Sequence, residues 1–231
     1  MKYYAIIVAG GSGSRMNSQI PKQFLLLNGK PVLMHTIEAF HFSDIKPKII
    51  LVLNAEFHLL WKELCDLHNF TIPCTIVNNG TERFHSVKNG LGLADDHSVI
   101  AVHDAVRPVV SNELITRSFY LADHCGAVIP VVTSKDSVRL KEGNDSITLN
   151  REDVVLVQTP QVFKAELLKN AYNQKYSKEF TDDASVVEKA GHHITLTQGD
   201  YKNIKITYSE DLELAALYLE KAKKNPANGP D

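Results

Sequence analysis

A glycine-rich segment follows the first apolar run of this chain, and its residue types suit the binding of an anion. Ala9-Gly10-Gly11-Ser12-Gly13-Ser14-Arg15-Met16 comes directly after the apolar run Tyr4–Ala9. Glycine lets backbone N–H groups approach a phosphate closely. The residues that we expect to contribute in this way are Gly10, Gly11, Ser12 and Gly13. Taken alone, the segment would also suit a structural turn.

Two common phosphate-binding motifs do not fit this segment. A dinucleotide fingerprint would have its third glycine where the chain has Met16, and a P-loop would have Lys followed by Ser or Thr where the chain has Ser14-Arg15. The sequence therefore predicts a phosphate site of another kind.

Two cations beside the glycine-rich segment are candidates for binding one polyphosphate. Arg15 lies within the segment, and Lys22 follows in Pro21-Lys22-Gln23-Phe24. Arginine offers a fork of N–H donors, whereas lysine offers a point charge. Each would be a solvated surface cation if it stood elsewhere, but at the end of the first strand we expect both to contact phosphate.

A carboxylate ends another apolar run. His103-Asp104-Ala105-Val106-Arg107-Pro108 follows Val99–Val102. At the carboxyl end of a strand in an α/β sheet, Asp104 would reach the ligand crevice, where it could bind a divalent cation or substrate hydroxyls. The alternative is a surface ion pair between Asp104 and Arg107, and His103 is interpreted as structural.

Further candidates are individually weaker. Gly80 and Ser86 enter a predicted helix and could line a base or ribose pocket, whereas Thr181-Asp182-Asp183-Ala184 is typical of a helix N-cap with acids in the first turn. Lys205 stands within Lys205–Thr207, which we predict to be a strand, and there it needs a partner anion. The remaining polar candidates are Ser137, Arg151 and Thr159.

Alternating apolar and amphipathic segments predict a doubly wound α/β sheet that would bring these residues together. The predicted strands are Tyr4–Ala9, Lys48–Leu53, Thr75–Asn78, Val99–His103, Gly126–Val132, Ser146–Asn150, Val154–Gln158 and Ile194–Gln198. The predicted helices are Pro31–Ser43, Phe57–His68, Thr81–Leu93, Asn112–His124, Lys164–Tyr176, Asp183–Ala190 and Glu210–Lys224. Several strands are continuous apolar runs, which is typical of a parallel sheet covered on both faces.

The alternation breaks between residues 131 and 156. Asp136–Leu140 and Ser146–Asn150 flank a polar Gly-Asn turn, which predicts a β-hairpin. Because it has few apolar residues, we expect it to project as a β-arm over roughly 135–156 and to pack on another subunit. We expect one domain over residues 1–224 and a disordered tail over 225–231.

Composition excludes several classes of protein. The 231 residues carry a net charge of −2, which argues against binding to nucleic acid or an anionic membrane by bulk charge. No apolar run approaches the roughly 18 residues of a membrane span. The 3 cysteines lack the spacing of a zinc site or a disulfide framework. The first residues do not resemble a secretory signal, so we expect a cytoplasmic protein.

Together the motifs resemble the signatures of the 2-C-methyl-D-erythritol 4-phosphate cytidylyltransferase family, in the family's order and over nearly the whole chain. They are the glycine-rich segment, Pro21-Lys22-Gln23-Phe24, His103-Asp104-Ala105-Val106-Arg107-Pro108, Thr159-Pro160-Gln161 and Asn203-Ile204-Lys205-Ile206-Thr207. The resemblance implies a Rossmann-like fold with a mostly parallel twisted sheet, and a homodimer that exchanges β-arms. It also implies transfer of CMP from CTP to 2-C-methyl-D-erythritol 4-phosphate, a sugar-alcohol phosphate, with Mg²⁺ or another divalent cation.

The resemblance also implies roles for individual residues. Arg15 and Lys22 fall on positions that bind the triphosphate and support its transition state, and Gly80 and Ser86 fall on cytidine-pocket positions. The residues implied around the metal and the acceptor phosphate are Asp104, Arg107, Arg151, Thr159 and Lys205, with Asp104 as the metal ligand. From its chemistry we also expect Lys205 to act catalytically by supporting the α-phosphate. Ser137 stands where the family often has threonine, and its hydroxyl is expected to keep the phosphate contact.

Two alternatives remain open at this point. Ribitol-5-phosphate cytidylyltransferase shares the glycine-rich segment and the motifs around Lys22 and Asp104, although Phe180-Thr181-Asp182-Asp183-Ala184-Ser185 looks closer to the methylerythritol family. A non-catalytic nucleotide-binding regulatory module could share the same fold. A dehydrogenase is disfavoured by Met16.

Overall fold

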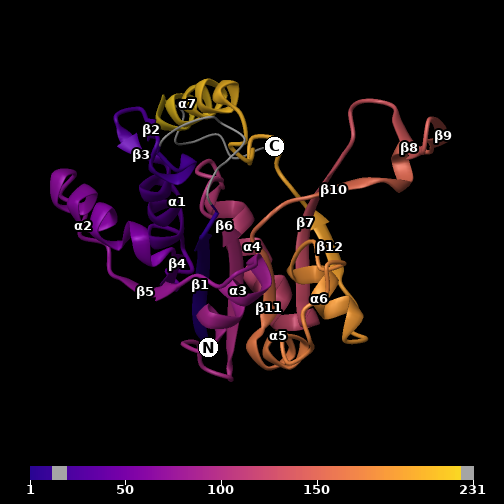
Figure 1. Ribbon diagram of the computed structural model, residues 1–231, viewed down its shortest axis with the longest axis horizontal. Helices are drawn as coiled ribbons and strands as arrows, with labels where there is room; N and C mark the ends of the chain where they lie inside the picture. The colour runs from indigo at the N-terminus through magenta and orange to yellow at the C-terminus, as the bar shows by residue number, and fades with distance from the viewer. Residues whose placement is uncertain (12–19, 225–231) are drawn as a thin grey trace.

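The computed structural model describes residues 1–11 and 20–224, and its central feature is a twisted eight-stranded sheet between helices (Figure 1). The strands of this sheet are β1 (Lys2–Ala9), β4 (Lys48–Leu53), β5 (Cys74–Asn78), β6 (Ser98–Asp104), β7 (Ala127–Thr133), β10 (Val155–Val157), β11 (Gln161–Lys164) and β12 (Thr195–Gln198). They run in the order β10-β7-β11-β6-β1-β4-β5, with β12 also paired to β7. The predicted doubly wound α/β sheet is confirmed.

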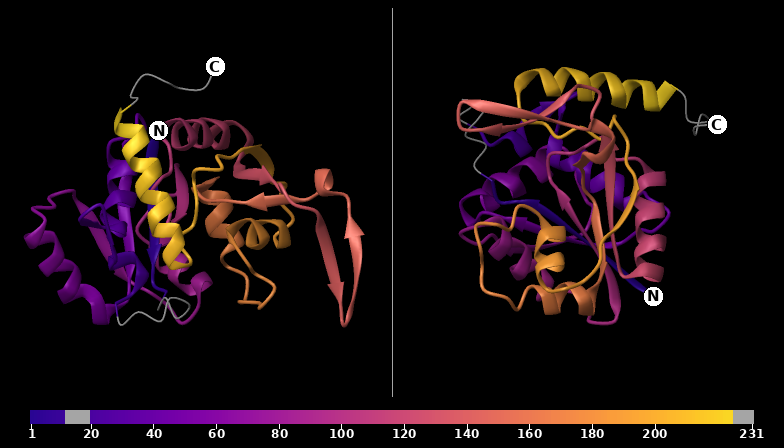
Figure 2. Two further views of the ribbon diagram at one scale, coloured as in Figure 1. Left: turned by 90° about the horizontal axis from the view of Figure 1, so that it is seen from above. Right: turned by 90° about the vertical axis from the view of Figure 1, so that its right-hand side faces the viewer.

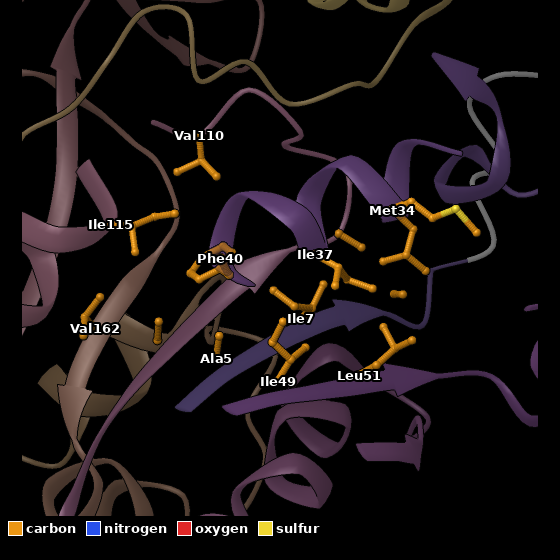
Figure 3. Packing of buried hydrophobic residues seen from close by; sticks show 14 of the residues in the cluster. Ala5, Ile7, Met34, Ile37, Phe40, Ile49, Leu51, Val110, Ile115 and Val162 are labelled. Carbon is orange, nitrogen blue, oxygen red and sulfur yellow. The ribbon is translucent and has the colours of Figure 1, made fainter. Parts of the chain in front are cut away.

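Helices cover both faces of the sheet. They are α1 (Val32–His41), α2 (His58–Leu67), α3 (Arg83–Leu91), α4 (Asn112–Cys125), α5 (Ala165–Ala171), α6 (Asp183–Lys189) and α7 (Ser209–Lys224). One apolar cluster joins the sheet to α1, α2 and α4, and Figure 3 shows its centre around Ile7, Ile37 and Phe40. A second cluster joins the other face to α3, α5 and α6. Within the described residues, no helix is long and apolar enough to cross a lipid bilayer.

β1 shows why the sheet is buried on both faces. Ala5 and Ile7 belong to the first cluster, whereas Tyr4 and Ile6 belong to the second. Because successive side chains of a strand point to opposite faces, a continuous apolar run is what such a position requires. The interpretation of these runs as strands covered on both sides is confirmed.

Local signals set the ends of α4 as the sequence suggests. The Ser111 hydroxyl accepts a hydrogen bond from the Leu114 amide at 3.1 Å, and Glu113 lies in the first turn. The hydroxyl satisfies one of the free N–H groups at the helix start. The negative charge of Glu113 interacts favourably with the partial positive charge of that end of the helix. Gly126 ends the helix with a φ of 91°, a conformation that favours glycine.

The direction of winding reverses at β1, and we call the region beside the carboxyl ends of β1 and β6 the crevice. β1 pairs in parallel with β4 and also with β6, so Val8 lies opposite Asp104. The Ala105 amide donates to the Val8 carbonyl at 3.2 Å just beyond the strand ends. In open α/β sheets, ligands bind at such a switch point beside the carboxyl ends of the strands. The glycine-rich segment follows the end of β1 in the sequence, and Asp104 is the last residue of β6.

A hairpin projects from the body of the molecule. β8 (Val138–Glu142) and β9 (Asp145–Leu149) form a separate antiparallel pair, and Glu142 lies opposite Asp145, so that residues 143–144 make the turn. Gly143 has a φ of 61°, which suits a tight hairpin turn. Figures 1 and 2 show the pair extending away from the sheet. The hairpin pairing is confirmed, whereas its role as an arm between subunits stays a prediction.

The structure differs from the prediction at β11 and at residues 205–207. β11 was not predicted, and it lies antiparallel between β6 and β7, so the sheet is mixed although mostly parallel. Lys205–Thr207 is not a strand; the Ile206 amide instead donates to the Val106 carbonyl at 2.9 Å, outside any ladder. Its alternating apolar pattern arises because Ile206 is buried in a small cluster with α7. The predicted tail, 225–231, lies outside the described residues.

Candidate active site

Asp104 is the centre of a cluster of charges at the end of β6. Its Oδ2 atom lies 3.0 Å from Lys205 Nζ and 3.3 Å from Arg107 Nε, and its Oδ1 atom lies 4.0 Å from Arg83 Nε. These residues come from separate parts of the sequence. The structure therefore brings together three predicted site residues, Asp104, Arg107 and Lys205, and adds Arg83.

The Asp104 carboxyl stays ionised in this setting. Burial raises its pKa, but the positive charges of Arg83, Lys205 and Arg107 outweigh burial and hold the pKa below its usual range. Opposite charges within a few ångströms favour the charged form of each partner. The cluster is thus a fixed arrangement of one anion and several cations, with the Lys205 side chain still 44% exposed at its edge.

A chain of hydrogen bonds fixes the backbone beneath Asp104. The Asp104 amide lies 3.1 Å from the Thr159 hydroxyl, which lies 3.0 Å from His103 Nδ1, and His103 Nε2 lies 3.2 Å from the Arg107 carbonyl. A carbonyl only accepts, so Nε2 carries the proton, and the Thr159 hydroxyl donates to Nδ1. Burial lowers the His103 pKa to about 3, so the ring is neutral. His103 is structural, as predicted.

Arg107 and Thr159 also fasten the segment that carries Lys205. Arg107 Nη1 donates to the Asn203 carbonyl at 2.8 Å, and Asn203 Nδ2 donates to the Thr159 carbonyl at 2.8 Å. Arg107, Thr159 and Asn203 are 9%, 5% and 0% exposed. They hold Lys205 and Asp104 at their mutual distance.

Lys22 approaches the same segment from the other side of the crevice. It begins a short 3₁₀ helix, η2 (Lys22–Phe24), and its Nζ donates to the Ile206 carbonyl at 3.1 Å. The neighbouring Gln23 is buried and donates through Nε2 to the carbonyls of Ala9 at 2.9 Å and Gly11 at 3.2 Å. Gln23 thus ties the Lys22 segment to the start of the glycine-rich segment.

The glycine-rich segment is described only at its start. Gly10 lies where a Cβ atom would come within 2.8 Å of Asn79 Cβ, so a larger residue would displace its neighbour. Gly11 is exposed. The predicted residues Ser12, Gly13 and Arg15 lie outside the described residues.

Gly80 and Ser86 form one local structure. The Gly80 amide donates to the Ser86 hydroxyl at 3.0 Å, and that hydroxyl donates to the Glu82 carbonyl at 3.1 Å. A Cβ on Gly80 would lie 2.2 Å from His85 Cβ, so this position requires glycine. Ser86 is buried and shapes the loop before α3. The backbone of this loop, and not the Ser86 side chain, is therefore the part that could line a nucleoside pocket.

Ser137 and Arg151 lie apart from the Asp104 cluster. Both are exposed, and within the described residues no hydrogen bond or ion pair joins either of them to Asp104, Arg107 or Lys205. Arg151 begins η4 (Arg151–Asp153) and borders an open depression of about 450 Å³ that Lys135 and Tyr201 also line. Among the described residues, the structure therefore shows no direct polar contact between Ser137 or Arg151 and the Asp104 cluster.

The described residues do not form a metal site by themselves. Among residues 1–11 and 20–224, no group of three or more His, Cys, Asp and Glu side chains could hold a metal ion. Asp104 offers one carboxylate, and its Oδ2 atom already faces Lys205 and Arg107. Because Asp104 already lies beside three cationic side chains, a divalent cation at this place would have to be held mainly by phosphate oxygens of a substrate.

Sequence reasoning missed several residues that shape the site. Gln23 and Asn203 stand in motifs that were recognised, but their buried hydrogen bonds to backbone carbonyls depend on the fold. Arg83 lies midway between Gly80 and Ser86 in the sequence, and its charge next to a predicted pocket was the available signal. Its partners lie far away along the chain, so the sequence could not pair them.

Comparison with known proteins gives consistent matches along nearly the whole chain. The family model described as IspD: 2-C-methyl-D-erythritol 4-phosphate cytidylyltransferase matches residues 3–221. A protein of that name from Bacteroides fragilis is 53% identical over 215 residues, covering 93% of this chain and 98% of the relative. One from Bacteroides thetaiotaomicron is 50% identical over 219 residues, covering 95% of this chain and 100% of the relative.

Solved structures with the same fold carry equivalent names. The chain resembles 4-diphosphocytidyl-2C-methyl-D-erythritol synthase from Anaerococcus prevotii with a TM-score of 0.80 and 30% identity, covering 95% of this chain and 96% of that one. It also resembles 2-C-methyl-D-erythritol 4-phosphate cytidylyltransferase from Francisella tularensis, with a TM-score of 0.79 and 32% identity. That match covers 94% of this chain and 100% of the solved chain. Sequence, fold and the charged crevice agree, and the chain belongs to the 2-C-methyl-D-erythritol 4-phosphate cytidylyltransferase family.

Proposed function

We propose that this protein transfers CMP from CTP to 2-C-methyl-D-erythritol 4-phosphate and releases pyrophosphate, as a step of isoprenoid precursor biosynthesis. The observation that carries the proposal is the convergence of Lys22, Arg107 and Lys205 from distant segments at the ends of β1 and β6. Ligands bind at this place in α/β sheets, and clustered cations suit a polyphosphate. Family membership supplies the identity of the two substrates.

The reaction needs little acid–base chemistry from the protein. The acceptor is a phosphate monoester, which is largely ionised near pH 7, so its oxygen can attack the α-phosphorus without a general base. The bond from the α-phosphorus to the bridging oxygen breaks, and that oxygen leaves with pyrophosphate. The buried, neutral His103 is consistent with this chemistry, because its ring nitrogens are engaged with Thr159 and Arg107.

The main barrier is electrostatic, and the crevice is suited to lower it. Two anions must meet, and negative charge builds up on the oxygens of the α-phosphate. Preorganised cations and N–H groups stabilise such charge at little reorganisation cost. We assign the triphosphate to Lys22, to Arg15 and to the backbone of Gly10, Gly11, Ser12 and Gly13, and we assign the α-phosphate to Lys205.

The nucleoside would lie against the loop formed by residues 80–82. Gly80 and Ser86 set the shape of residues 80–82, at the start of α3. Gly80 keeps the loop free of a side chain, so that backbone groups can reach a base or ribose closely. This assignment rests on the loop's shape and on the family's cytidine pocket.

We assign the acceptor phosphate to both the crevice and the hairpin. Asp104, Arg107 and Thr159 lie in the crevice, whereas Ser137 and Arg151 are exposed near the hairpin. Leu140 and Ile147 lie opposite each other on the hairpin and are 49% and 47% exposed. Exposed apolar pairs of this kind suit a contact with a second copy of the chain. A homodimer would carry Ser137 and Arg151 to the partner's crevice.

A divalent cation would complete the site together with CTP. When bound, it neutralises phosphate charge and fixes the shape of the triphosphate. Asp104 is the described residue that could contact it. We further propose that residues 1–224 act as a single catalytic domain and that the protein works in the cytoplasm.

A pyrophosphate-release assay with a small panel of polyol phosphates tests the proposal. We expect release that requires both CTP and 2-C-methyl-D-erythritol 4-phosphate, with little release when ribitol 5-phosphate replaces it. The family match disfavours the ribitol acceptor and the non-catalytic module. Preferred use of ribitol 5-phosphate would overturn the acceptor assignment, and CTP binding without release would favour the regulatory module.

A further inference from the structure

A buried carboxylate outside the residues assigned so far contacts the charged crevice through one arginine. Asp183 is the first residue of α6 and is 0% exposed. Its Oδ2 atom lies 2.6 Å from Arg83 Nη2, and its Oδ1 atom accepts a hydrogen bond from the Tyr172 hydroxyl at 2.6 Å. A fully buried carboxylate is costly unless it is paired in this way.

Capping of α6 does not account for Asp183. The sequence pattern around it predicts an N-cap followed by acids in the first turn, and Asp182 makes the cap by accepting from the Ser185 amide at 2.9 Å. The Asp183 side chain instead points to Arg83 and Tyr172. Its position therefore calls for another explanation.

Arg83 connects Asp183 with the crevice. It is the first residue of α3, directly after the loop that Gly80 and Ser86 shape, and its Nε lies 4.0 Å from Asp104 Oδ1. Burial lowers the Arg83 pKa, but the charges of Asp183 and Asp104 raise it overall above the usual value. The side chain is still 31% exposed, and among the described residues only its Nη2 donates a hydrogen bond, to Asp183.

The two carboxylates share Arg83 unequally. The Asp183 contact, at 2.6 Å, is a charge-assisted hydrogen bond, whereas the distance of 4.0 Å to Asp104 is too long for one. Asp104 Oδ2 is occupied by Lys205 and Arg107. Arg83 is therefore held mainly by Asp183, and Asp104 Oδ1 accepts no hydrogen bond from Arg83, Lys205 or Arg107.

Aromatic packing makes this anchor rigid. Phe84 stacks on Tyr172 at 4.6 Å between ring centroids and on Phe180 at 5.6 Å, with an angle of 18° between the planes in each pair. The start of α3 is therefore fixed to the segment that leads into α6. A side chain held by such packing keeps the geometry of the residue it supports.

We propose that Asp183 is a positioning residue for nucleotide binding, because it holds the Arg83 guanidinium between Asp104 and the nucleoside loop with its free donors facing the bound nucleotide. The proposal rests on the function proposed above and adds to it a residue that never touches the substrate. Without the Asp183 charge, Arg83 closes onto Asp104. Arg83 and the Asp104 oxygen that could contact the divalent cation are then withdrawn from the bound nucleotide, while Arg107, Thr159 and the hairpin groups that we assign to the acceptor stay in place.

Asp183→Asn tests the proposal, with Tyr172→Phe as its matched control. Asp183→Asn replaces the buried carboxylate by a neutral amide and so removes the charge that holds Arg83, whereas Tyr172→Phe removes only a neutral donor to the same carboxylate. We expect Asp183→Asn to raise the KM for CTP about tenfold while kcat and the KM for the acceptor change less than about threefold. Tyr172→Phe should leave the KM for CTP within about twofold of wild type, although both variants melt at lower temperature. A purely structural role would move the two variants alike, and that result would overturn the proposal.

A double-mutant cycle with Arg83→Gln shows whether Asp183 acts through Arg83. We expect Arg83→Gln to raise the KM for CTP, and adding Asp183→Asn to raise it no further. Independent, additive effects would contradict the proposal. If Asp183→Asn does not fold, Arg83→Lys takes its place, because lysine keeps the charge but lacks the fork that spans both carboxylates. An unchanged KM for CTP in Arg83→Lys would then overturn the proposal.

Calorimetric titration of CTP separates this inference from the proposed function. Wild-type protein that binds CTP without transfer refutes the proposed reaction alone, and the variants are then compared by their Kd. Wild-type turnover with an unaffected Asp183→Asn refutes the positioning role alone. Absence of CTP binding by the wild type overturns both.

Discussion

The crevice at the ends of β1 and β6 and the hairpin β8–β9 hold their polar residues in contrasting ways. In the crevice, Asp104 is paired with Lys205 and Arg107, and buried hydrogen bonds support it from below. On the hairpin, Arg139 bonds to Ser146 and Thr148 across the two strands, while the functional candidate Ser137 is exposed. The hairpin's polar bonds hold its own strands together, whereas those of the crevice fix groups that can face a ligand.

The contrast indicates which part of the reaction one chain can prepare alone. Groups that stabilise a transition state must be held in place before the substrate arrives. The crevice meets this condition for the nucleotide within a single chain. If Ser137 and Arg151 contact the acceptor as proposed, they would meet it only after the hairpin packs against another surface.

The largest effect should come from breaking the charge balance of the crevice. Asp104→Asn leaves Lys205, Arg107 and Arg83 close together without their counter-ion, and we expect a loss of about 3 kcal/mol in the free energy of unfolding at pH 7. The folded-state pKa of Asp104 lies below the unfolded value of about 3.9. The stabilisation is therefore fully present above that value and is lost as the pH falls through the folded pKa.

Urea unfolding of wild type and Asp104→Asn at pH 7, 5 and 3 measures this effect. The difference between the two proteins should be constant from pH 7 to 5 and smaller at pH 3. A difference that stays the same at pH 3 would show that Asp104 does not owe its stabilising effect to its charge.

The next largest effect should come from removing a cation that faces the triphosphate. Lys22→Ala should lower kcat by at least about 100-fold, or about 2.7 kcal/mol, because charge on the phosphates is no longer neutralised in the transition state. Lys30→Ala is the matched control, since Lys30 pairs with Glu38 on α1. Pyrophosphate release at wild-type rate by Lys22→Ala would refute the assignment.

A smaller effect is expected for Arg107, which supports the acceptor side of the crevice. Arg107→Ala should raise the KM for the sugar phosphate about tenfold, or about 1.4 kcal/mol, with a smaller change in the KM for CTP. Steady-state kinetics with each substrate varied in turn separates the two values. A change confined to CTP would mean that Arg107 serves the nucleotide instead.

The smallest effect on the fold itself is expected at the hairpin. Leu140→Ser should change the free energy of unfolding by less than about 0.5 kcal/mol, because the side chain is half exposed in the single chain. The same change should shift the protein from dimer to monomer in sedimentation and lower activity. An unaltered sedimentation coefficient with full activity would remove the hairpin from the site.

Mixing two inactive variants sharpens the comparison further. Dimers formed from Lys22→Ala and Arg151→Ala chains contain one complete site if Arg151 acts across the interface. An equal mixture with free exchange should then regain about a quarter of wild-type activity. No regain would place Arg151 and Lys22 in the same chain's site.

The sequence predicts the positions of the strands better than it predicts the contacts between side chains. β1 and β6 are continuous apolar runs, so their burial and their ends follow from composition, and Asp104 is correctly placed at an end. β11 is short and joins two strands distant in sequence, so no local period reveals it. Lys205 lies in an alternating pattern that is typical of a strand. Its neighbour Ile206 is instead buried in the small apolar cluster under α7, and the Ile206 amide donates to the Val106 carbonyl outside any strand pairing.

For the site residues too, the sequence predicts the positions better than the contacts between side chains. Asp104, Arg107 and Lys205 belong to motifs with a chemical meaning, and the fold brings them together. Arg83 and Asp183 are separated by 100 positions along the chain, and their contact arises because α3 and α6 both belong to the second apolar cluster of the fold. The sequence offers a cation and an acid there, but their pairing depends on tertiary structure.

The central claim is that the cations of the crevice gather around one cytidine triphosphate. A crystal structure of the protein with CTP and a divalent cation tests it most directly. We predict phosphate oxygens within hydrogen-bonding distance of Lys22 Nζ and Lys205 Nζ, and the nucleoside against residues 80–82. A nucleotide bound elsewhere, with both ammonium groups turned away from its phosphates, would contradict the account.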